Sequence, residues 1–177
     1  MILFVCTGNT CRSPMAEALL RHHLGDDTTV PIASVGTIGW NGYPATPHAV
    51  EVLAERGIDL GSHISRKINR DDVDRSDLII AMTRKHGWAV AAHDPEASTR
   101  TFLLGEVTRL ARLQRRNGES LREWAEAIAR TRKPDQPMGH ARDEIHDPVG
   151  ESIDVYRATA EVLDRLLAEL AGAIKGP

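Results

Sequence analysis

Short apolar segments alternate along the chain with longer segments whose apolar residues recur every three or four positions. The apolar segments lie at residues 2–5, 32–35, 78–82 and 101–104. Segments of this length are typical of buried strands, and 78–82 is the clearest because no polar residue interrupts it. Strands that alternate with amphipathic helices predict an α/β fold, with a parallel sheet covered by helices on both faces.

Three helix starts are marked by capping residues. Ser13-Pro14 predicts a helix through about Leu24, with Ser13 as N-cap and Pro14 at the first helical position. Thr46-Pro47 predicts a second helix, and Gly57 stands where a C-terminal stop belongs. Ser152 precedes a final helix. Its apolar residues form one stripe, which predicts that it lies on the sheet: Ile153, Tyr156, Ala160, Leu163, Leu167, Leu170 and Ile174.

Residues 105–143 differ in character from the rest of the chain. Two stretches with helical spacing flank the break at Asn117-Gly118, and the segment Lys133–Gly139 contains two prolines. We expect two helices and a flexible connection here. Several arginines make the stretch locally basic, for which solvated helix faces are the simpler explanation.

Length and composition indicate one globular domain over residues 1–177. Hydrophobic residues make up 41% of the chain and charged residues 27%, and the net charge is −3. This balance gives no reason to expect binding to nucleic acid or to an anionic membrane. No apolar run reaches the length of a membrane span or a signal-peptide core, so we expect a cytoplasmic protein. The two cysteines do not form a disulfide framework.

The loop after the first strand carries the candidate chemistry. It reads Cys6-x5-Arg12-Ser13 and leads into a helix. The N–H groups at a helix N-terminus bind anions, and the planar guanidinium of Arg12 suits two phosphoryl oxygens. The same positive surroundings are expected to lower the pKa of Cys6, while Ser13 can donate a hydrogen bond to its thiolate. The expected phosphate-binding residues are Thr7, Gly8, Asn9, Thr10, Cys11 and Ser13.

Simpler interpretations exist for each part of this loop. A cysteine after an apolar strand is often a small buried residue, and Cys6 with Cys11 resembles half of a zinc site. No second cysteine pair follows, so we expect neither a metal nor another cofactor. The absence of Gly-Lys-Ser/Thr excludes a nucleotide-binding Walker loop.

The segment VCTGNTCRSPMAEALL resembles the active-site signature of the low-molecular-weight protein tyrosine phosphatases. Further segments resemble this family in the same order: SVGT at 34–37, GIDLGSHISRKI at 57–68, DLIIAMT at 77–83 and DPVGESIDVY at 147–156. The resemblance implies a four-stranded parallel sheet, an anion loop between the first strand and the first helix, and a phosphocysteine intermediate. It implies Cys6 as nucleophile, Arg12 as phosphate ligand and Asp147 as general acid. It spans nearly the whole chain except residues 105–143, which we interpret as an insertion.

The Asp-Pro pair is also chemically sensible, because one carboxyl group can protonate the leaving group and later activate water. Pro148 favours an extended conformation at Asp147. Taken without the resemblance, Asp-Pro is usually a turn signal.

The resemblance implies that the substrate is a phosphorylated protein side chain, either phosphoarginine or phosphotyrosine. Members that act on phosphotyrosine usually have two aromatic residues after Asp-Pro, where this chain has Val149-Gly150, and a β-branched aliphatic residue where it has Thr10. CTGNTCRS, AMT and ATPHAVE resemble the bacterial protein-arginine phosphatase branch, although that branch has an aromatic residue at the position of Val149. Trp40 and Tyr43 are candidates for the aromatic surface that Val149 does not provide. Alternatively, these two residues pack on a surface loop.

Two other functions remain open from the sequence. An arsenate reductase uses the same kind of anion loop but passes electrons to further cysteines, and none follows Cys11. A non-catalytic module that binds phosphorylated ligands would not need the thiol. Cys11 is either an inward-packed residue or the partner of a redox-sensitive Cys6 in a reversible disulfide.

Overall fold

Four parallel strands form one sheet in the computed structural model, which describes residues 1–25, 28–38, 40–132 and 138–176. The strands are β1 (Ile2–Cys6), β2 (Ile32–Gly36), β3 (Leu78–Ala81) and β4 (Thr101–Leu103). Their order is β2-β1-β3-β4. The predicted strands and the four-stranded parallel sheet are confirmed, with each boundary within one residue of its expected place.

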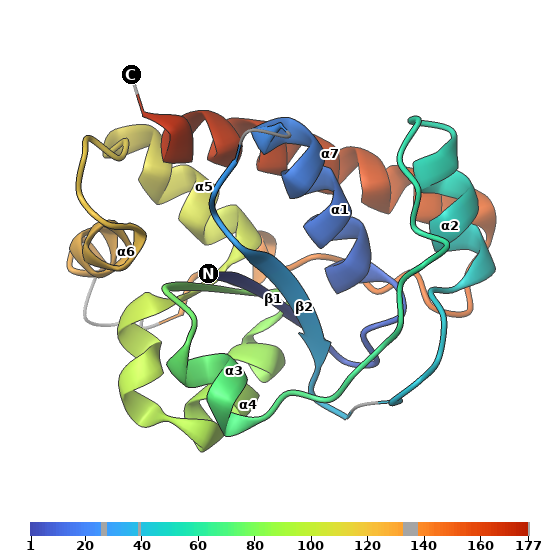
Figure 1. Cartoon of the computed structure of the whole chain (residues 1–177), viewed down its shortest axis with the longest axis horizontal. Helices are drawn as coiled ribbons and strands as arrows, with labels where there is room; N and C mark the ends of the chain where they lie inside the picture. The colour runs from blue at the N-terminus through green and yellow to red at the C-terminus, as the bar shows by residue number, and fades with distance from the viewer. Residues whose placement is uncertain (26–27, 39, 133–137, 177) are drawn as a thin grey trace.

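Helices cover both faces of the sheet (Figure 1). One face carries α1 (Arg12–Leu24), α2 (Pro47–Ala54), α5 (Leu104–Leu113) and α7 (Ile153–Lys175), and the other carries α3 (Arg70–Asp74) and α4 (Arg84–His93). α6 (Leu121–Ala129) packs beside the first group, and two short 3-10 helices are η1 (Pro95–Arg100) and η2 (Ala141–Asp143). None of the described helices is long and apolar enough to cross a membrane.

Alternation along β1 divides the core between the two faces. Ile2 and Phe4 are fully buried in the cluster that contains α1 and α7, whereas Leu3 and Val5 are fully buried in the cluster that contains α3 and α4. A central strand covered on both sides has no solvent-facing positions, which explains its uninterrupted apolar sequence.

The apolar stripe predicted for the last helix is confirmed by α7. Six of the seven residues are buried in the large core cluster, and Ile153 is partly buried against it. Ser152 is the N-cap residue, as expected, although its side chain makes no capping hydrogen bond.

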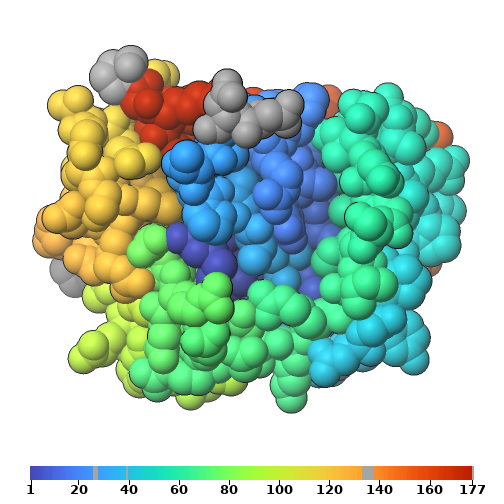
Figure 2. Space-filling view, viewed as in Figure 1, coloured from blue at the N-terminus to red at the C-terminus, as the bar shows by residue number. Residues whose placement is uncertain are grey.

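Residues 105–143 contribute to the same core. The two expected helices are α5 and α6, and Val107, Ala111 and Trp124 are buried in the large cluster with α7. Figure 2 shows the yellow and orange surface of this stretch continuous with the rest of the molecule. Of the predicted loop Lys133–Gly139, residues 133–137 lie outside the described part, and Met138 packs against Ala81 and Leu103.

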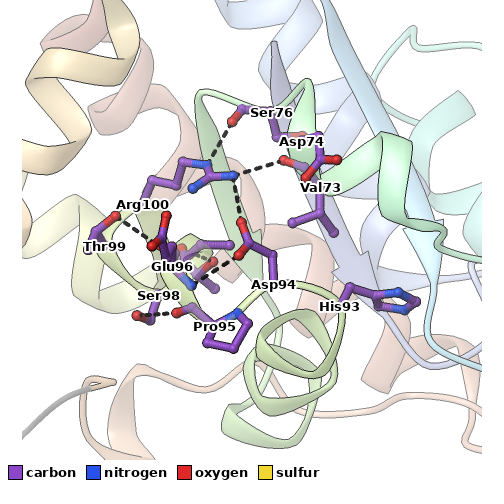
Figure 3. A network of polar contacts seen from close by, with 12 residues as sticks. Val73, Asp74, Ser76, His93, Asp94, Pro95, Glu96, Ser98, Thr99 and Arg100 are labelled. Carbon is purple, nitrogen blue, oxygen red and sulfur yellow. Dashed lines mark hydrogen bonds and ion pairs between the residues drawn. The ribbon is translucent and has the colours of Figure 1, made fainter.

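A buried arginine fixes the start of β3. Arg100 is 6% exposed, and its guanidinium donates to the carbonyls of Ser76 (3.0 Å) and Val73 (3.2 Å) and to Asp94 Oδ2 (3.4 Å) (Figure 3). A buried charge requires such compensation. The network joins α3, β3 and η1, and it therefore holds the strand that leads to the site described next.

Candidate active site

The loop between β1 and α1 begins at Cys6, the last residue of the central strand. The carboxyl ends of β1 and β3 meet at this edge of the sheet, where the strand order reverses and parallel α/β proteins place their ligands. Cys6 is 3% exposed, and Ser13 Oγ lies 3.0 Å from its sulfur. The predicted Ser13–Cys6 contact is confirmed.

The prediction that Ser13 caps α1 is wrong. The helix begins at Arg12 with Cys11 as N-cap residue, and no side chain caps it. Ser13 lies inside the first turn, and its hydroxyl is engaged with the loop instead. Arg12 is thus the first helical residue, beside the unpaired N–H groups of the helix N-terminus.

Asn9 holds the loop in shape. Its φ of 57° is the left-handed conformation that asparagine tolerates, as expected from its residue type. Its Nδ2 donates to Ser13 Oγ (3.0 Å) and Ser34 Oγ (2.9 Å), and its Oδ1 accepts from the N–H of Arg66 (2.9 Å). His63 Nε2 donates to the Asn9 carbonyl (2.7 Å). Because Ser13 accepts from Asn9, its own proton can go to the sulfur of Cys6 (3.0 Å) or to the more distant Val35 carbonyl (3.4 Å).

The end of β2 packs directly against this loop. The N–H groups of Thr37 and Ile38 donate to the carbonyls of Cys6 (2.9 Å) and Thr7 (3.1 Å). A Cβ at Gly36 would lie 2.7 Å from the Thr7 carbonyl oxygen. Gly8, one of the expected phosphate-binding residues, does not have the positive φ that would require glycine. It instead leaves room for Trp40, whose Cε3 would be 3.3 Å from a Cβ there.

Arg12 reaches across the loop to the segment that contains Asp147. The guanidinium is buried, Nη1 donates to the carbonyl of Ile145 (3.2 Å), and Nη2 forms an ion pair with Asp147 Oδ2. Nε is buried and has no hydrogen-bond partner within the described residues. Such a buried unpaired donor costs stability, and an oxyanion over the loop would satisfy it. The Asp147 side chain is 45% exposed, so it faces the entrance of the site.

Cys6, Arg12 and Asp147 share one small pocket of about 80 Å³. Its lining also includes Thr7, Gly8, Thr10, Cys11, Trp40 and Val149. The structure therefore brings together the predicted nucleophile, the anion ligand, the acid and two of the three rim residues. Tyr43 does not line the pocket; it packs against Trp40, with 6.3 Å between ring centroids.

Cys11 points into the core beneath the loop. It is 2% exposed, and burial, with Cys6 close by, raises the pKa of its thiol to about 12. Both cysteines are free thiols. This geometry agrees with the inward-packing interpretation, and the reversible disulfide stays a prediction.

His86 contacts the site although no sequence pattern marks it. Its Nδ1 accepts from the N–H of Thr83 (3.1 Å), so Nε2 carries the proton and donates to Thr7 Oγ1 (2.9 Å). Burial, with Arg12 nearby, lowers the pKa of His86 to about 4, which keeps the ring neutral. A groove of about 510 Å³ joins His86 to Arg12 and Asp147.

This arrangement suits transfer of a phosphoryl group to sulfur. A thiol at the end of a strand, a ring of loop N–H groups, a guanidinium and an acid at the entrance are the parts that such a reaction requires. In the described part of the chain, no group of three or more histidine, cysteine or acidic side chains has a geometry that would hold a metal ion.

Comparisons with known proteins agree with this geometry. The family model "Low molecular weight phosphotyrosine protein phosphatase" matches residues 1–117. A protein-arginine-phosphatase of Bacillus subtilis is 33% identical over 175 residues, which cover 98% of this chain and 96% of that protein. The probable low-molecular-weight protein-tyrosine-phosphatase EpsP of Ralstonia solanacearum is 43% identical over 106 residues, covering 60% of this chain and 71% of EpsP.

Solved structures are similar over the same length. A mutant of the arginine phosphatase YwlE with a phosphorylated active-site serine is 33% identical and superposes with a TM-score of 0.76, covering 98% of this chain and 95% of that one. These matches do not favour an arsenate reductase. The chain belongs to the low-molecular-weight phosphotyrosine protein phosphatase family and is a cysteine-based protein phosphatase.

Proposed function

We propose that this enzyme hydrolyses phosphoarginine in proteins, with Cys6 as nucleophile, Arg12 as phosphate ligand and Asp147 as general acid and base. The observation that carries the preference for arginine is the position of Thr10 in the pocket beside Cys6 and Arg12. The two free cysteines are compatible with a reducing compartment, so the proposal includes a cytoplasmic location and phosphorylated proteins as partners.

The reaction proceeds in two steps. The Cys6 thiolate attacks phosphorus, the bond from phosphorus to the substrate nitrogen breaks, and Asp147 gives its proton to that nitrogen. Water then attacks the phosphocysteine, Asp147 takes a proton from it, and the sulfur–phosphorus bond breaks to release phosphate and the thiolate. Arg12 and the loop N–H groups bind the phosphoryl oxygens in both steps.

Thr10 offers a polar contact next to the reacting bond. Its backbone is fixed by a hydrogen bond from the N–H of Thr46 to its carbonyl (2.8 Å). Its hydroxyl makes no hydrogen bond to the described residues and is therefore available to a ligand. A phosphorylated guanidine carries N–H donors beside phosphorus, and this hydroxyl can accept from one of them. An aliphatic side chain in the same place would leave that donor unpaired.

Phosphotyrosine is the second candidate because Trp40 lines the pocket. An indole face can pack against a phenyl ring. Val149, which also lines the pocket, is 49% exposed and supplies a smaller apolar surface than an aromatic residue would.

The test is the ratio of kcat/KM for matched phosphoarginine and phosphotyrosine peptides. The wild-type enzyme should favour phosphoarginine. Thr10→Ile should lower this ratio by about one to two orders of magnitude, since an unpaired buried polar group costs roughly 1–3 kcal/mol. Thr10→Ser keeps the hydroxyl and is the matched control. An enzyme that ignores phosphoarginine, or a Thr10→Ile variant that loses both activities equally, would contradict the preference for arginine.

A further inference from the structure

The first turn of α4 touches both segments that carry the proposed catalytic groups. This helix begins directly after β3, with Thr83 as N-cap residue. One of its side chains contacts the loop that follows Cys6, and another contacts the segment that precedes Asp147. Neither residue reaches phosphorus or sulfur in the mechanism above.

The contact on the nucleophile side is the hydrogen bond from His86 to Thr7. The ring is held from behind by Thr83, whose N–H donates to Nδ1 at 3.1 Å. Its other nitrogen donates to Thr7 Oγ1 at 2.9 Å, and His86 is 5% exposed. Because the ring is neutral and enclosed, it presents one N–H in a fixed direction to the residue that follows the nucleophile.

On the acid side, Arg84 holds Glu144 through two hydrogen bonds. Its Oε1 accepts from Arg84 Nε (2.7 Å) and from the Arg84 backbone N–H (3.2 Å) at the start of the helix. Burial of the carboxyl acts to raise the pKa of Glu144, but the contacts with Arg84 outweigh burial. They lower this pKa and keep the carboxylate charged. A carboxylate at a helix N-terminus is further stabilised by the helix dipole.

Further hydrogen bonds fix the backbone between Glu144 and Asp147. The N–H of Ile145 donates to the Met82 carbonyl (2.8 Å), and the Ile145 carbonyl accepts from Arg12 Nη1 (3.2 Å). Asp147 follows two residues later and forms the ion pair with the same guanidinium. The position of the acid therefore depends on a segment that is fixed at Glu144 and Ile145.

We propose that the first turn of α4 is a positioning element that aligns the acid with the nucleophile: Arg84 holds Glu144, and through it Asp147, while His86 holds Thr7 and the phosphate-binding loop. The proposal rests on the proposed roles of Cys6 and Asp147. The two halves of the element have different kinetic consequences, because one positions a proton donor and the other positions an anion site.

The acid half is tested with aryl phosphates whose leaving groups differ in pKa. Glu144→Leu and Arg84→Met should lower kcat/KM by roughly tenfold to a hundredfold for the poorest leaving groups, the size expected when a reacting group is misplaced. The best leaving groups need no proton, so their kcat/KM should change by less than about twofold. The double variant should lose no more than Glu144→Leu alone, because that substitution already removes the side-chain contact that Arg84→Met breaks.

Controls separate this effect from a general loss of structure. Glu144→Gln keeps an acceptor for Arg84 and should recover part of the activity. The Arg157–Glu55 ion pair (2.7 Å) joins α7 to α2, so Glu55→Leu should leave the leaving-group dependence unchanged. A uniform loss across all leaving groups in Glu144→Leu, or an unchanged dependence, would overturn the acid half.

The nucleophile half is tested by anion binding. His86→Leu and Thr7→Val should each weaken orthovanadate binding by roughly threefold to tenfold, the worth of one hydrogen bond, with no change in leaving-group dependence. His86→Gln, which can still donate to Thr7, should restore binding. Unchanged vanadate affinity in both variants would overturn this half. If the loss of kcat/KM in Asp147→Asn is the same for all leaving groups, the general-acid role of Asp147 fails. The acid half then fails with it, while the vanadate result stands.

Discussion

At the scale of single residues, Asp147 should matter most for the substrate that most needs a proton. Guanidine groups are very strong bases, so the nitrogen of phosphoarginine cannot leave without protonation. We expect Asp147→Asn to lower kcat/KM for a phosphoarginine peptide by about 10²–10⁴-fold. The loss for p-nitrophenyl phosphate, whose phenolate leaves readily, should be much smaller. Steady-state kinetics on the two substrates measure this difference, and equal losses would mean that another group supplies the proton.

Cys11 provides a second prediction at this scale. The buried Cys11 thiol, with its pKa of about 12, stays protonated at neutral pH, so peroxide should oxidise Cys6 first. We expect inactivation that thiols reverse through a Cys6–Cys11 disulfide, formed faster as the pH rises because Cys11 must lose its proton to react. Cys11→Ser should then recover poorly after peroxide. Full recovery in that variant would leave Cys11 as a packing residue.

At the scale of elements, the contact between β2 and the phosphate loop is tested at Gly36. An alanine Cβ would lie 2.7–2.9 Å from backbone atoms of Thr7, Gly8 and Asn9, which cannot rotate away. Gly36→Ala should displace the loop, lower kcat/KM by roughly 10²-fold for every substrate, and cost about 1–3 kcal/mol of stability. Kinetics and urea unfolding measure both effects.

Gly172 is the matched control for this substitution. It lies within α7, and a Cβ added there would meet no neighbouring atom within 4 Å. Gly172→Ala should therefore stabilise the helix by about 1 kcal/mol without affecting turnover. Wild-type activity in Gly36→Ala would show that the loop tolerates a shift of β2.

The elements that the sequence predicts are those with a strong apolar pattern. The four strands and α7 are visible as apolar runs or a stripe, because burial decides their composition. The pattern does not predict α3 and α4. The sequence RDDVD of α3 is almost wholly polar, and in RKHGWAVAAH of α4 the only large apolar residue that is buried is Val90. The start of α1 is misplaced by the sequence because Ser13-Pro14 is a capping signal, whereas the hydroxyl serves the loop.

At the scale of the whole molecule, the residues that support the loop lie far from it in the sequence, so local patterns do not predict them. Cys6, Arg12 and Asp147 are predictable, since they fall in recognisable motifs. Ser34 and His86, separated from their loop partners by 25 and 79 positions, have no role that the sequence assigns. Such contacts exist only once the parallel sheet brings the carboxyl ends of its strands to one edge. A serine in a strand or a histidine in a helix carries no local signal of that kind.

The stability of the whole protein should therefore depend on pH through His86. Its pKa is lowered to about 4 in the folded protein, compared with about 6.5 in an unfolded chain. As the pH falls from 6.5 toward 4, the unfolded chain binds a proton at His86 that the folded protein does not bind, so the free energy of unfolding decreases. This contribution is fully present above about pH 6.5, and its complete loss amounts to about 3 kcal/mol.

His86→Gln removes the titrating group. In urea unfolding, the stability of this variant should therefore decrease less steeply than that of the wild type between pH 6.5 and 5, a window above the range where carboxylates titrate. His22→Gln, which replaces an exposed histidine, should keep the wild-type slope. Equal slopes for wild type and His86→Gln would show that His86 accepts a proton in the folded state, and the fixed neutral donor to Thr7 would then have to be abandoned.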